Sequence, residues 1–540
     1  MRSRPSTRSQ GPMFSFLLRL FPASAPLLAP VVDYPFSRTD VAMLQQLAGT
    51  APQIDAQTWH DLLLDPYSER LAQQTSIFGQ QELHRRLQGG RATPESIERV
   101  DALLADAPLA AGLTQACHGL RRADAEASTS LFGAPFASRP WWSGWLWLIA
   151  LALLLSIGAT WLVGPLALTG VLACCVVLMT VQSRFYETCK QWEYQLDTLR
   201  HLLKAYAALG RLDVPMTAPF RAGRAQAGKL VRGIELSLLR YLPLIDTIMV
   251  EYGDWLLLKN VTRYFRTREL VAAQLGFLRQ AYLEVAALEA DLALVRHLRA
   301  QPAFCHAKEG APRELDLQDM VHPLLSQAAP LSLNLAQRGA FISGQNGIGK
   351  STLLRTLGLN LVCARAFGFC HARSATLPRG PVYSSMQSED SLAGGESLYL
   401  AELRRARELL ALAQGDHDAL FIIDEIFRGT NHLESISAAA AVLHQLAARH
   451  LVIVSSHNLV LAPLLEAWLA PWCVQRDNAG SLTLAPGVLA ATNGIALLAE
   501  RGFGRQIEDS AGRVFDWLST HMAQPTNCSG VLVGSVSAAA

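Results

Sequence analysis

One short run in this 540-residue chain has the spacing of a phosphate-binding loop. Residues 344–351 read GQNGIGKS, which fits the pattern G-x-x-x-x-G-K-[ST], and an apolar segment at 340–343 precedes it. Glycines let backbone N–H groups approach phosphate oxygens, and the start of the helix expected after the loop adds a favourable field. The pattern therefore predicts a nucleotide site. Its residues are Gly344, Asn346, Gly347, Gly349, Lys350, Ser351 and Thr352.

Lys350 and Ser351 have the most direct chemical roles in this site. A lysine at this position contacts the β- and γ-phosphates, and the serine hydroxyl is a ligand for Mg²⁺. We therefore expect ATP and Mg²⁺ at the site, and we count Lys350 among the catalytic residues.

Two carboxylates follow a second apolar segment, residues 419–423. Asp424 suits the binding of Mg²⁺, and Glu425 suits a general base that polarises the attacking water. A third apolar segment leads to His457. Because the carboxyl ends of parallel strands converge on a ligand, we expect His457 to sense the γ-phosphate. The alternatives are an acidic end of a buried strand and a structural histidine.

A further stretch, SEDSLAGGES at 388–397, opens a helix expected to run through Leu410. Two glycines and a hydroxyl at a helix N-terminus form a second anion-binding corner. Two corners in one domain predict a homodimer that holds ATP between its subunits, in which Ser397 contacts the partner's nucleotide. An ordinary capped helix is the alternative.

The elements that must position these residues begin after Pro330, where short apolar runs alternate with glycine-rich turns. This texture predicts an α/β P-loop ATPase domain at the C-terminal end of the chain. The preceding residues show apolar positions at three- and four-residue spacing, typical of helices. We interpret residues 210–230, which contain Arg221, Arg224 and Lys229, as a loop that is either solvated or in contact with phosphate or anionic lipid.

Residues 141–182 contain no Asp, Glu, Lys, Arg or His, which indicates a segment that lies in a membrane. This length is enough for two membrane spans, and Gly164-Pro165 near the middle predicts a turn between helices at 143–162 and 166–183. Tryptophans cluster at one end, and basic residues flank both ends. We expect a transmembrane hairpin in the cytoplasmic (inner) membrane, with the ATPase domain on the cytoplasmic side. A buried helical hairpin is the alternative.

The expected organisation follows from these segments, with a disordered or misassigned start in place of a signal peptide. Its divisions are 1–30 (start), 31–140 (helical region), 141–183 (membrane hairpin), 184–313 (helical core and lever), 314–515 (ATPase domain) and 516–540 (tail).

Composition excludes several other classes of protein. Hydrophobic residues make up 50% and charged residues 17% of the chain, which is too apolar for a disordered protein. A formal net charge of +2 gives no overall electrostatic signal for nucleic acid. The nine cysteines contain no C-x-x-C pair, so we expect reduced thiols and neither a disulfide framework nor a zinc site.

Together, the motifs resemble the ATPase domain of the MutS family, a branch of the ABC-type ATPases. The similar blocks within residues 314–512 are GQNGIGKST, SEDSLAGGESLYLAEL, FIIDEIFRGTN, VIVSSHN and LAPGVLAATNGIALLAERGFGRQIEDSA. Residues 54–71 and 184–300 resemble the helical core and lever of the same family. We find no room for a separate mismatch-reading domain, so the chain resembles a membrane-tethered variant that lacks it.

The resemblance implies an ATP sandwich in a head-to-tail homodimer. It implies that Ser397 acts in trans and that five residues act in cis, namely Lys350, Ser351, Asp424, Glu425 and His457. It also implies coupling of ATP hydrolysis to movement of helical arms, with DNA or an unknown protein as the client. The alternatives are an ABC-transporter-like engine, suggested by LAGGE at 392–396, and a tethered DNA repair or recombination protein.

Overall fold

The computed structural model describes residues 33–49, 52–136, 138–238, 255–386, 398–415, 417–477, 480–489, 493–494 and 496–521. The chain forms two compact units that do not follow chain order. The first comprises the described residues within 1–48, 74–82 and 107–290, and the second comprises those within 49–73, 83–106 and 291–540. The predicted start at 1–30 and the SEDSLAGGES stretch with Ser397 lie outside the described residues.

The first unit is built from helices, as predicted for the region before the ATPase domain. Its described helices are α2 (Arg38–Leu47), α7 (Ala107–Cys117), α8 (Ser128–Phe132), α9 (Trp147–Val163), α10 (Leu168–Leu209), α11 (Ala218–Leu238) and α13 (Lys259–Ala273). Two further helices, α5 (Ile77–Gly89) and α14 (Leu275–Arg299), contribute residues to both units.

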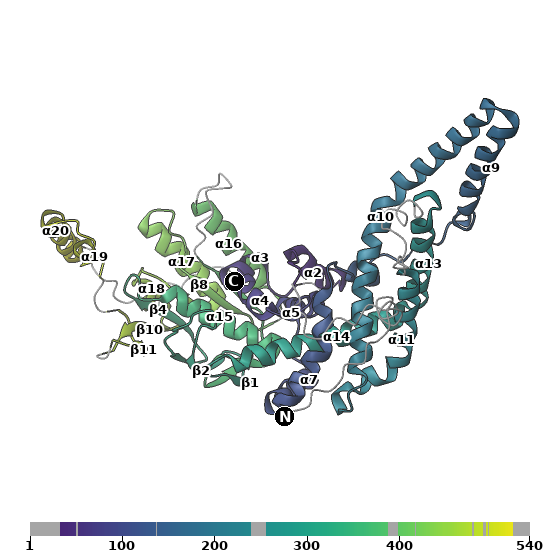
Figure 1. Ribbon diagram of the computed structural model, residues 1–540. Coiled ribbons are helices and arrows are strands. Elements are labelled where there is room, and N and C mark those ends of the chain that lie inside the picture. The colour runs from purple at the N-terminus through teal and green to yellow at the C-terminus, as the bar shows by residue number, and fades with distance from the viewer. Residues whose placement is uncertain are drawn as a thin grey trace, which may run out of the picture. The chain divides into compact units, whose positions relative to one another are not determined.

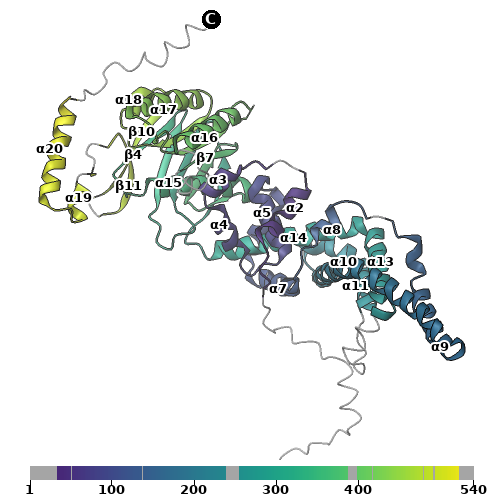
Figure 2. The same ribbon diagram turned by 90° about the horizontal axis from the view of Figure 1, so that it is seen from above.

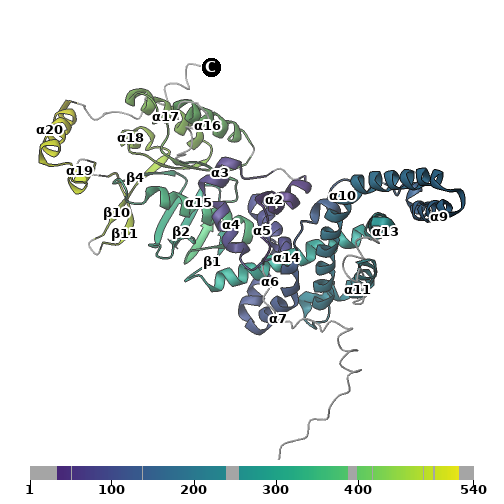
Figure 3. The same ribbon diagram turned by 45° about the horizontal axis from the view of Figure 1, so that its top comes forward.

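The apolar run of the first unit forms α9 and the start of α10, which lie side by side (Figures 1 and 3). The break falls at Gly164, whose φ of +80° favours glycine. The second helix does not end near 183 as expected. It continues to Leu209 because no helix breaker intervenes before Gly210 and the amphipathic stretch after 183 packs its apolar side.

Among the described helices, one is long and apolar enough to cross a membrane. It comprises Pro165–Leu209, and its most apolar window of 18 residues has a mean hydropathy of 2.0 and is 11% buried. Helix α9 has only 17 residues. The expected pair of spanning helices is therefore corrected to one helix of spanning length beside one shorter apolar helix.

The loop expected over 210–230 is also wrong, because α11 begins at Ala218. Pro219 lies in the first turn, where proline costs no hydrogen bond. Gly223 does not break the helix. It allows α11 to lie close to α10 and α14, since a Cβ there would lie 2.7 Å from the Tyr206 hydroxyl and 2.8 Å from the Phe277 ring.

The second unit combines helices with two sheets. Its described helices are α3 (Ala56–Asp61), α4 (Leu64–Ala72), α6 (Pro94–Ala105), α15 (Lys350–Phe367), α16 (Leu398–Leu412), α17 (His432–Ala447), α18 (Leu461–Leu465), α19 (Ala496–Glu500) and α20 (Arg505–His521). Helix α20 crosses the division expected at 515. The smaller sheet has the described order β3-β2-β6-β1-β5. Its strands are β1 (Cys305–Glu309), β2 (Glu314–Met320), β3 (Leu331–Ala336), β5 (Phe369–Cys370) and β6 (Ser374–Leu377).

The larger sheet has the described order β11-β10-β4-β9-β8-β7. Its strands are β4 (Gly339–Gly344), β7 (Val382–Ser385), β8 (Leu420–Asp424), β9 (Leu451–Ser455), β10 (Leu469–Arg476) and β11 (Leu482–Pro486). All neighbours pair in parallel except β10 and β11. The carboxyl ends of β4, β8 and β9 therefore meet at one edge, as the predicted α/β domain requires.

Helices cover both faces of this sheet (Figure 2). On one face, Phe421, Ile423 and Val454 pack with apolar residues of α16, α17 and α18. On the other face, α15 passes so close that a Cβ on Gly358 would lie 3.1 Å from the Ile422 side chain. Because both faces are covered, β8 and β9 are fully buried, which explains their continuous apolar sequences.

Candidate functional site

The phosphate-binding loop connects β4 to α15, as the motif predicts. Gly347 and Gly349 have φ values of +73° and +107°, in the region that favours glycine. A Cβ on Gly347 would meet nothing within 4 Å, so the backbone conformation, not space, requires glycine there. Ser351 and Thr352 lie in the first turn of α15, directly after the loop.

Lys350 points its ammonium group into the loop. Its Nζ donates hydrogen bonds to the carbonyl oxygens of Gly344 and Gln345, each at 3.0 Å. Burial lowers the pKa of Lys350, and the nearby Glu425 and Asp424 carboxylates oppose that shift. The structure thus brings the lysine of the loop and the two predicted acidic residues into one electrostatic environment.

Asp424 is the last residue of β8 and is almost fully buried, with 4% of its surface exposed. Its carboxylate accepts a hydrogen bond from the Ser455 hydroxyl at the end of β9. The two residues are register partners in the parallel pair. A buried carboxylate fixed by a neighbouring strand is a preorganised oxygen ligand for a hard cation.

Glu425 follows Asp424 with a φ of +57°, which is uncommon for a residue with a side chain. Its Oε1 lies 3.0 Å from Nε2 of His457, and its Oε2 lies 3.3 Å from Nε of Arg428. The predicted base and the predicted γ-phosphate sensor are therefore direct neighbours. Such backbone outliers concentrate at functional sites.

Sequence reasoning missed Arg428 and its second partner, Glu402 of α16. Glu402 accepts from the Arg428 backbone N–H at 2.8 Å and from its Nε at 3.4 Å. Arg428 thus stands between two carboxylates, which fixes its position beside Glu425. In the sequence, Arg428 is only a charged residue three positions after Glu425. That spacing is common on protein surfaces, so it did not point to the site.

Asn493 is a second residue that sequence reasoning did not assign individually. Its Oδ1 accepts from the backbone N–H of Asn346 at 2.9 Å, and its Nδ2 donates to the Asn346 carbonyl at 3.4 Å. The chain after β11 also contacts β4, because the Leu489 N–H donates to the Ser343 hydroxyl at 2.9 Å. The segment after β11 therefore holds β4 through Leu489 and the phosphate-binding loop through Asn493.

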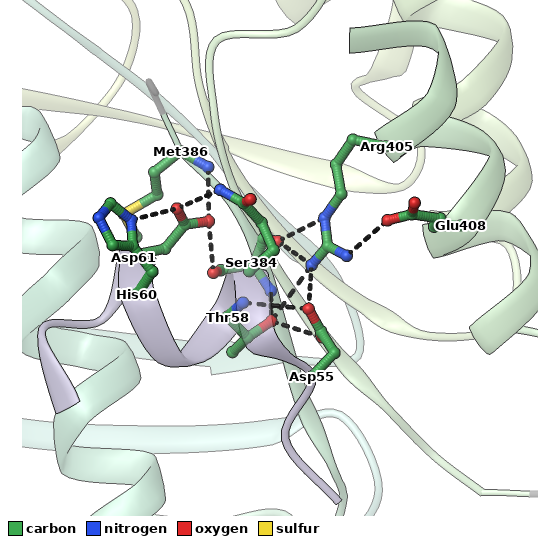
Figure 4. A network of polar contacts seen from close by, with 9 residues as sticks. Asp55, Thr58, His60, Asp61, Ser384, Met386, Arg405 and Glu408 are labelled. Atoms are coloured by element: carbon green, nitrogen blue, oxygen red, sulfur yellow. Dashed lines mark hydrogen bonds and ion pairs between the residues drawn. The ribbon is translucent and has the colours of Figure 1, made fainter. Parts of the chain in front are cut away.

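A third missed group lies where α3 packs on β7 (Figure 4). Asp61 accepts hydrogen bonds from the Ser384 hydroxyl at 2.8 Å and from the Met386 backbone N–H at 2.9 Å. Arg405 of α16 forms an ion pair with Asp55 at 2.9 Å. Burial raises the pKa of Asp61, and its hydrogen bonds oppose that shift.

The residues at the strand edge fit a magnesium nucleotide. Mg²⁺ uses one or two protein oxygens together with water and phosphate oxygens, and Asp424 and Ser351 supply groups of that kind. The loop supplies backbone N–H donors at the start of α15, and Lys350 supplies a cation. Ser397, predicted to act from a second subunit, lies outside the described residues, so the shared site stays a prediction.

A cavity of 860 Å³ lies elsewhere in the second unit. Its lining includes Val382, Leu420 and Leu451, the first residues of β7, β8 and β9. It therefore opens at the amino ends of the strands, opposite the edge that carries Asp424 and Glu425. We do not assign it to nucleotide binding.

Comparisons with known proteins agree with this geometry. Residues 340–470 match the protein family described as MutS domain V. The chain is 28% identical over 258 residues to the DNA mismatch repair protein MutS of Thermus aquaticus, covering 45% of this chain and 31% of the relative. It is 32% identical over 195 residues to MutS of Thermosynechococcus vestitus, covering 34% and 22%.

These similarities are partial, since the matched region spans less than a third of the length of either relative. The family match covers the part of the chain whose strand ends gather the phosphate-binding loop, the paired carboxylates and His457. Residues 340–470 thus match the family described as MutS domain V, and they form a P-loop ATPase domain.

Proposed function

We propose that this chain hydrolyses ATP with Mg²⁺ in a head-to-tail homodimer and couples hydrolysis to movement of its helical region on DNA. One observation carries the proposal. The ends of three parallel strands bring together Lys350, Asp424, Glu425 and His457, with the Glu425 and His457 side chains 3.0 Å apart. The curated relatives are DNA mismatch repair proteins, which supports DNA as the client.

In this proposal each residue has one task. Lys350 leaves the carbonyl oxygens that it now contacts and binds the terminal phosphates of the substrate ATP. Glu425 accepts a proton from the attacking water, while His457 holds that carboxylate and faces the γ-phosphate. Asp424 and Ser351 orient Mg²⁺, which offsets negative charge on the phosphates when bound.

The test is the ATPase rate of the detergent-solubilised chain with and without double-stranded DNA, at low and moderate salt. The variant Lys350→Ala is the negative control, because it should lose ATP binding. Stimulation by DNA that fades with salt supports a DNA client, since phosphate contacts release counterions. Hydrolysis that is indifferent to DNA argues against DNA and favours a protein client. A wild-type rate equal to that of Lys350→Ala refutes the ATPase proposal.

The shared site has its own test. Ser397→Ala should lower turnover severalfold and leave ATP binding by the monomer unchanged, because Ser397 is proposed to contact the partner's nucleotide. Unchanged turnover would count against the sandwich.

We further propose that α9 and the first half of α10 insert into a lipid bilayer as a tether on the cytoplasmic side. Support comes from large apolar side chains of both helices that are more than half exposed. They are Trp147, Leu154, Leu155, Trp161, Leu162, Leu168, Leu172, Val176 and Met179. In water, an apolar surface of this extent is unfavourable, whereas hydrocarbon solvates it well.

Vesicle flotation tests the tether. The wild-type chain should float with phospholipid vesicles, and Leu155→Arg combined with Leu172→Arg should not, because arginine in a bilayer costs about 2.5–3.5 kcal/mol. Leu433→Arg is a matched control, since Leu433 of α17 is 70% exposed and lies in the ATPase unit. Equal flotation of all three proteins would refute insertion of these helices.

A further inference from the structure

Helix α3 belongs to the same compact unit as the ATPase domain, although more than 280 residues separate it from the phosphate-binding loop in sequence. Asp55 caps the helix by accepting from the Thr58 N–H at 3.0 Å. Asp55, Thr58 and Asp61 then face the ATPase domain from one helix. We refer to these three residues as the α3 anchor (Figure 4).

One arm of the α3 anchor reaches the strand next to the catalytic carboxylates. Asp61 holds the Ser384 hydroxyl and the Met386 N–H, and Thr58 accepts from the Ser384 N–H at 2.8 Å. Strand β7 pairs in parallel with β8, with Ser385 opposite Ile423. Met386 and Asp424 each follow one residue later, at the ends of these two strands. Asp61 thus fixes the end of the strand that flanks Asp424.

The other arm of the α3 anchor reaches Glu425 through α16. Asp55 pairs with Arg405, whose guanidinium also lies 3.2 Å from the Thr58 hydroxyl. Glu402 lies one helical turn from Arg405 and holds Arg428, which in turn contacts Glu425. The Arg405 side chain is only 11% exposed, so these partners offset the cost of burying its charge.

We infer that the α3 anchor is a positioning element of the ATPase site, which sets Asp424 through β7 and Glu425 through α16. The inference rests on the proposed ATPase function. None of the three anchor residues is expected to touch ATP. They act because a buried carboxylate in a low-dielectric interior fixes its hydrogen-bond donors strongly. A displacement of α3 therefore lowers turnover without removing a catalytic group.

The test compares Asp61→Asn and Ser384→Ala with the wild-type chain. Each should lower kcat about tenfold and change KM for ATP by less than twofold, because small misplacements of reacting groups slow chemistry more than they weaken binding. The pair should be non-additive in kcat, since both variants weaken the same contact between residues 61 and 384. A purely structural role would lower stability and leave the kcat of the folded protein unchanged.

Glu289 offers a closely matched control. It is a buried carboxylate in the first unit that accepts from the Ser76 hydroxyl, from the Ser76 N–H at 2.9 Å and from the Gly79 N–H at 3.1 Å. Glu289→Gln and Ser76→Ala remove the same kinds of hydrogen bond without touching β7. Both should keep the basal kcat within twofold of wild type.

The outcomes separate the two proposals. Wild-type hydrolysis with an unchanged kcat in folded Asp61→Asn and Ser384→Ala overturns the positioning role alone. If Asp61→Asn does not fold, Ser384→Ala decides, because it removes one hydroxyl and no charge. A kcat lowered equally in Glu289→Gln also overturns the role. A wild-type chain without ATPase activity overturns the proposed function and the inference together.

Discussion

At the residue scale, Glu425 combines an uncommon backbone conformation with two charged neighbours. Its φ of +57° turns the chain out of β8 directly after Asp424, so the two carboxylates point to different partners. Asp424 is held by Ser455 in the sheet, and Glu425 is held by His457 and Arg428 at the edge. Neighbours in sequence therefore take different roles because the backbone rotates between them.

Glu425→Gln should bind ATP and hydrolyse it about 10²–10⁴-fold more slowly, the range that a general base contributes. Glutamine keeps the shape of the side chain but accepts no proton at neutral pH. Equilibrium binding and steady-state turnover would be measured side by side. Glu434→Gln, at an exposed position in the first turn of α17, is the control. Equal turnover of Glu425→Gln and wild type would remove Glu425 from the base role.

Asn493→Ala should raise KM for ATP about fivefold, because a net hydrogen bond contributes about 1 kcal/mol to the loop conformation. The Asn346 backbone would lose the partner that braces it, while the catalytic groups stay in place, so kcat should change little. Asn334→Ala, at an exposed position of β3, is the control. A kcat effect without a KM effect would contradict the bracing role.

At the element scale, helix α11 shows how packing decides the effect of a glycine. Gly223 and Gly228 both lie inside α11. A Cβ on Gly223 would collide with Tyr206 and Phe277, whereas a Cβ on Gly228 would meet nothing within 4 Å. One glycine permits the close contact of α11 with its neighbours, and the other only weakens the helix.

The two glycines should therefore respond to alanine with opposite signs. Gly223→Ala should destabilise the first unit by about 1–3 kcal/mol, the usual cost of overpacking. Gly228→Ala should stabilise it by about 1 kcal/mol through helix propensity. Urea unfolding followed by circular dichroism measures both. Equal shifts of the same sign would show that α11 does not pack as described.

At the scale of the whole molecule, the second unit buries several neutral histidines. Burial lowers the pKa of His84, His297 and His322 to about 4 and that of His371 to about 3. The positive charge of Arg70 adds to the effect on His297 and His371. Each imidazole is therefore neutral in the fold but takes up a proton near pH 6.5 when the chain unfolds.

Stability of the second unit should therefore be full above pH 6.5 and fall as the pH drops towards 4. In that window the unfolded chain binds more protons than the folded chain. The free energy of unfolding therefore falls by up to about 1.4 kcal/mol per pH unit for each histidine. The urea midpoint at pH 7.5 and pH 5 measures this. His371→Gln should flatten the dependence, and the exposed His60→Gln should not. Identical midpoints at both pH values would contradict the prediction.

The sequence alone was sufficient for the elements that carry local signals. Residue spacing over short stretches of sequence predicts the phosphate-binding loop, the buried strands before Asp424 and His457, and the α/β class. The break at Gly164 follows in the same way. These features are local because glycine conformations, strand burial and helix starts depend on neighbours in sequence.

Only the tertiary structure decided which distant residues support the site. Asp61 and Ser384 are 323 positions apart, and Asn346 and Asn493 are 147 apart, so no spacing rule connects them. The continuation of α10 past 183 and the helical state of α11 were likewise decided by packing. Tertiary contacts supplied the partners that turn a local preference into one conformation, since most helical stability in proteins comes from the packing of an amphipathic face.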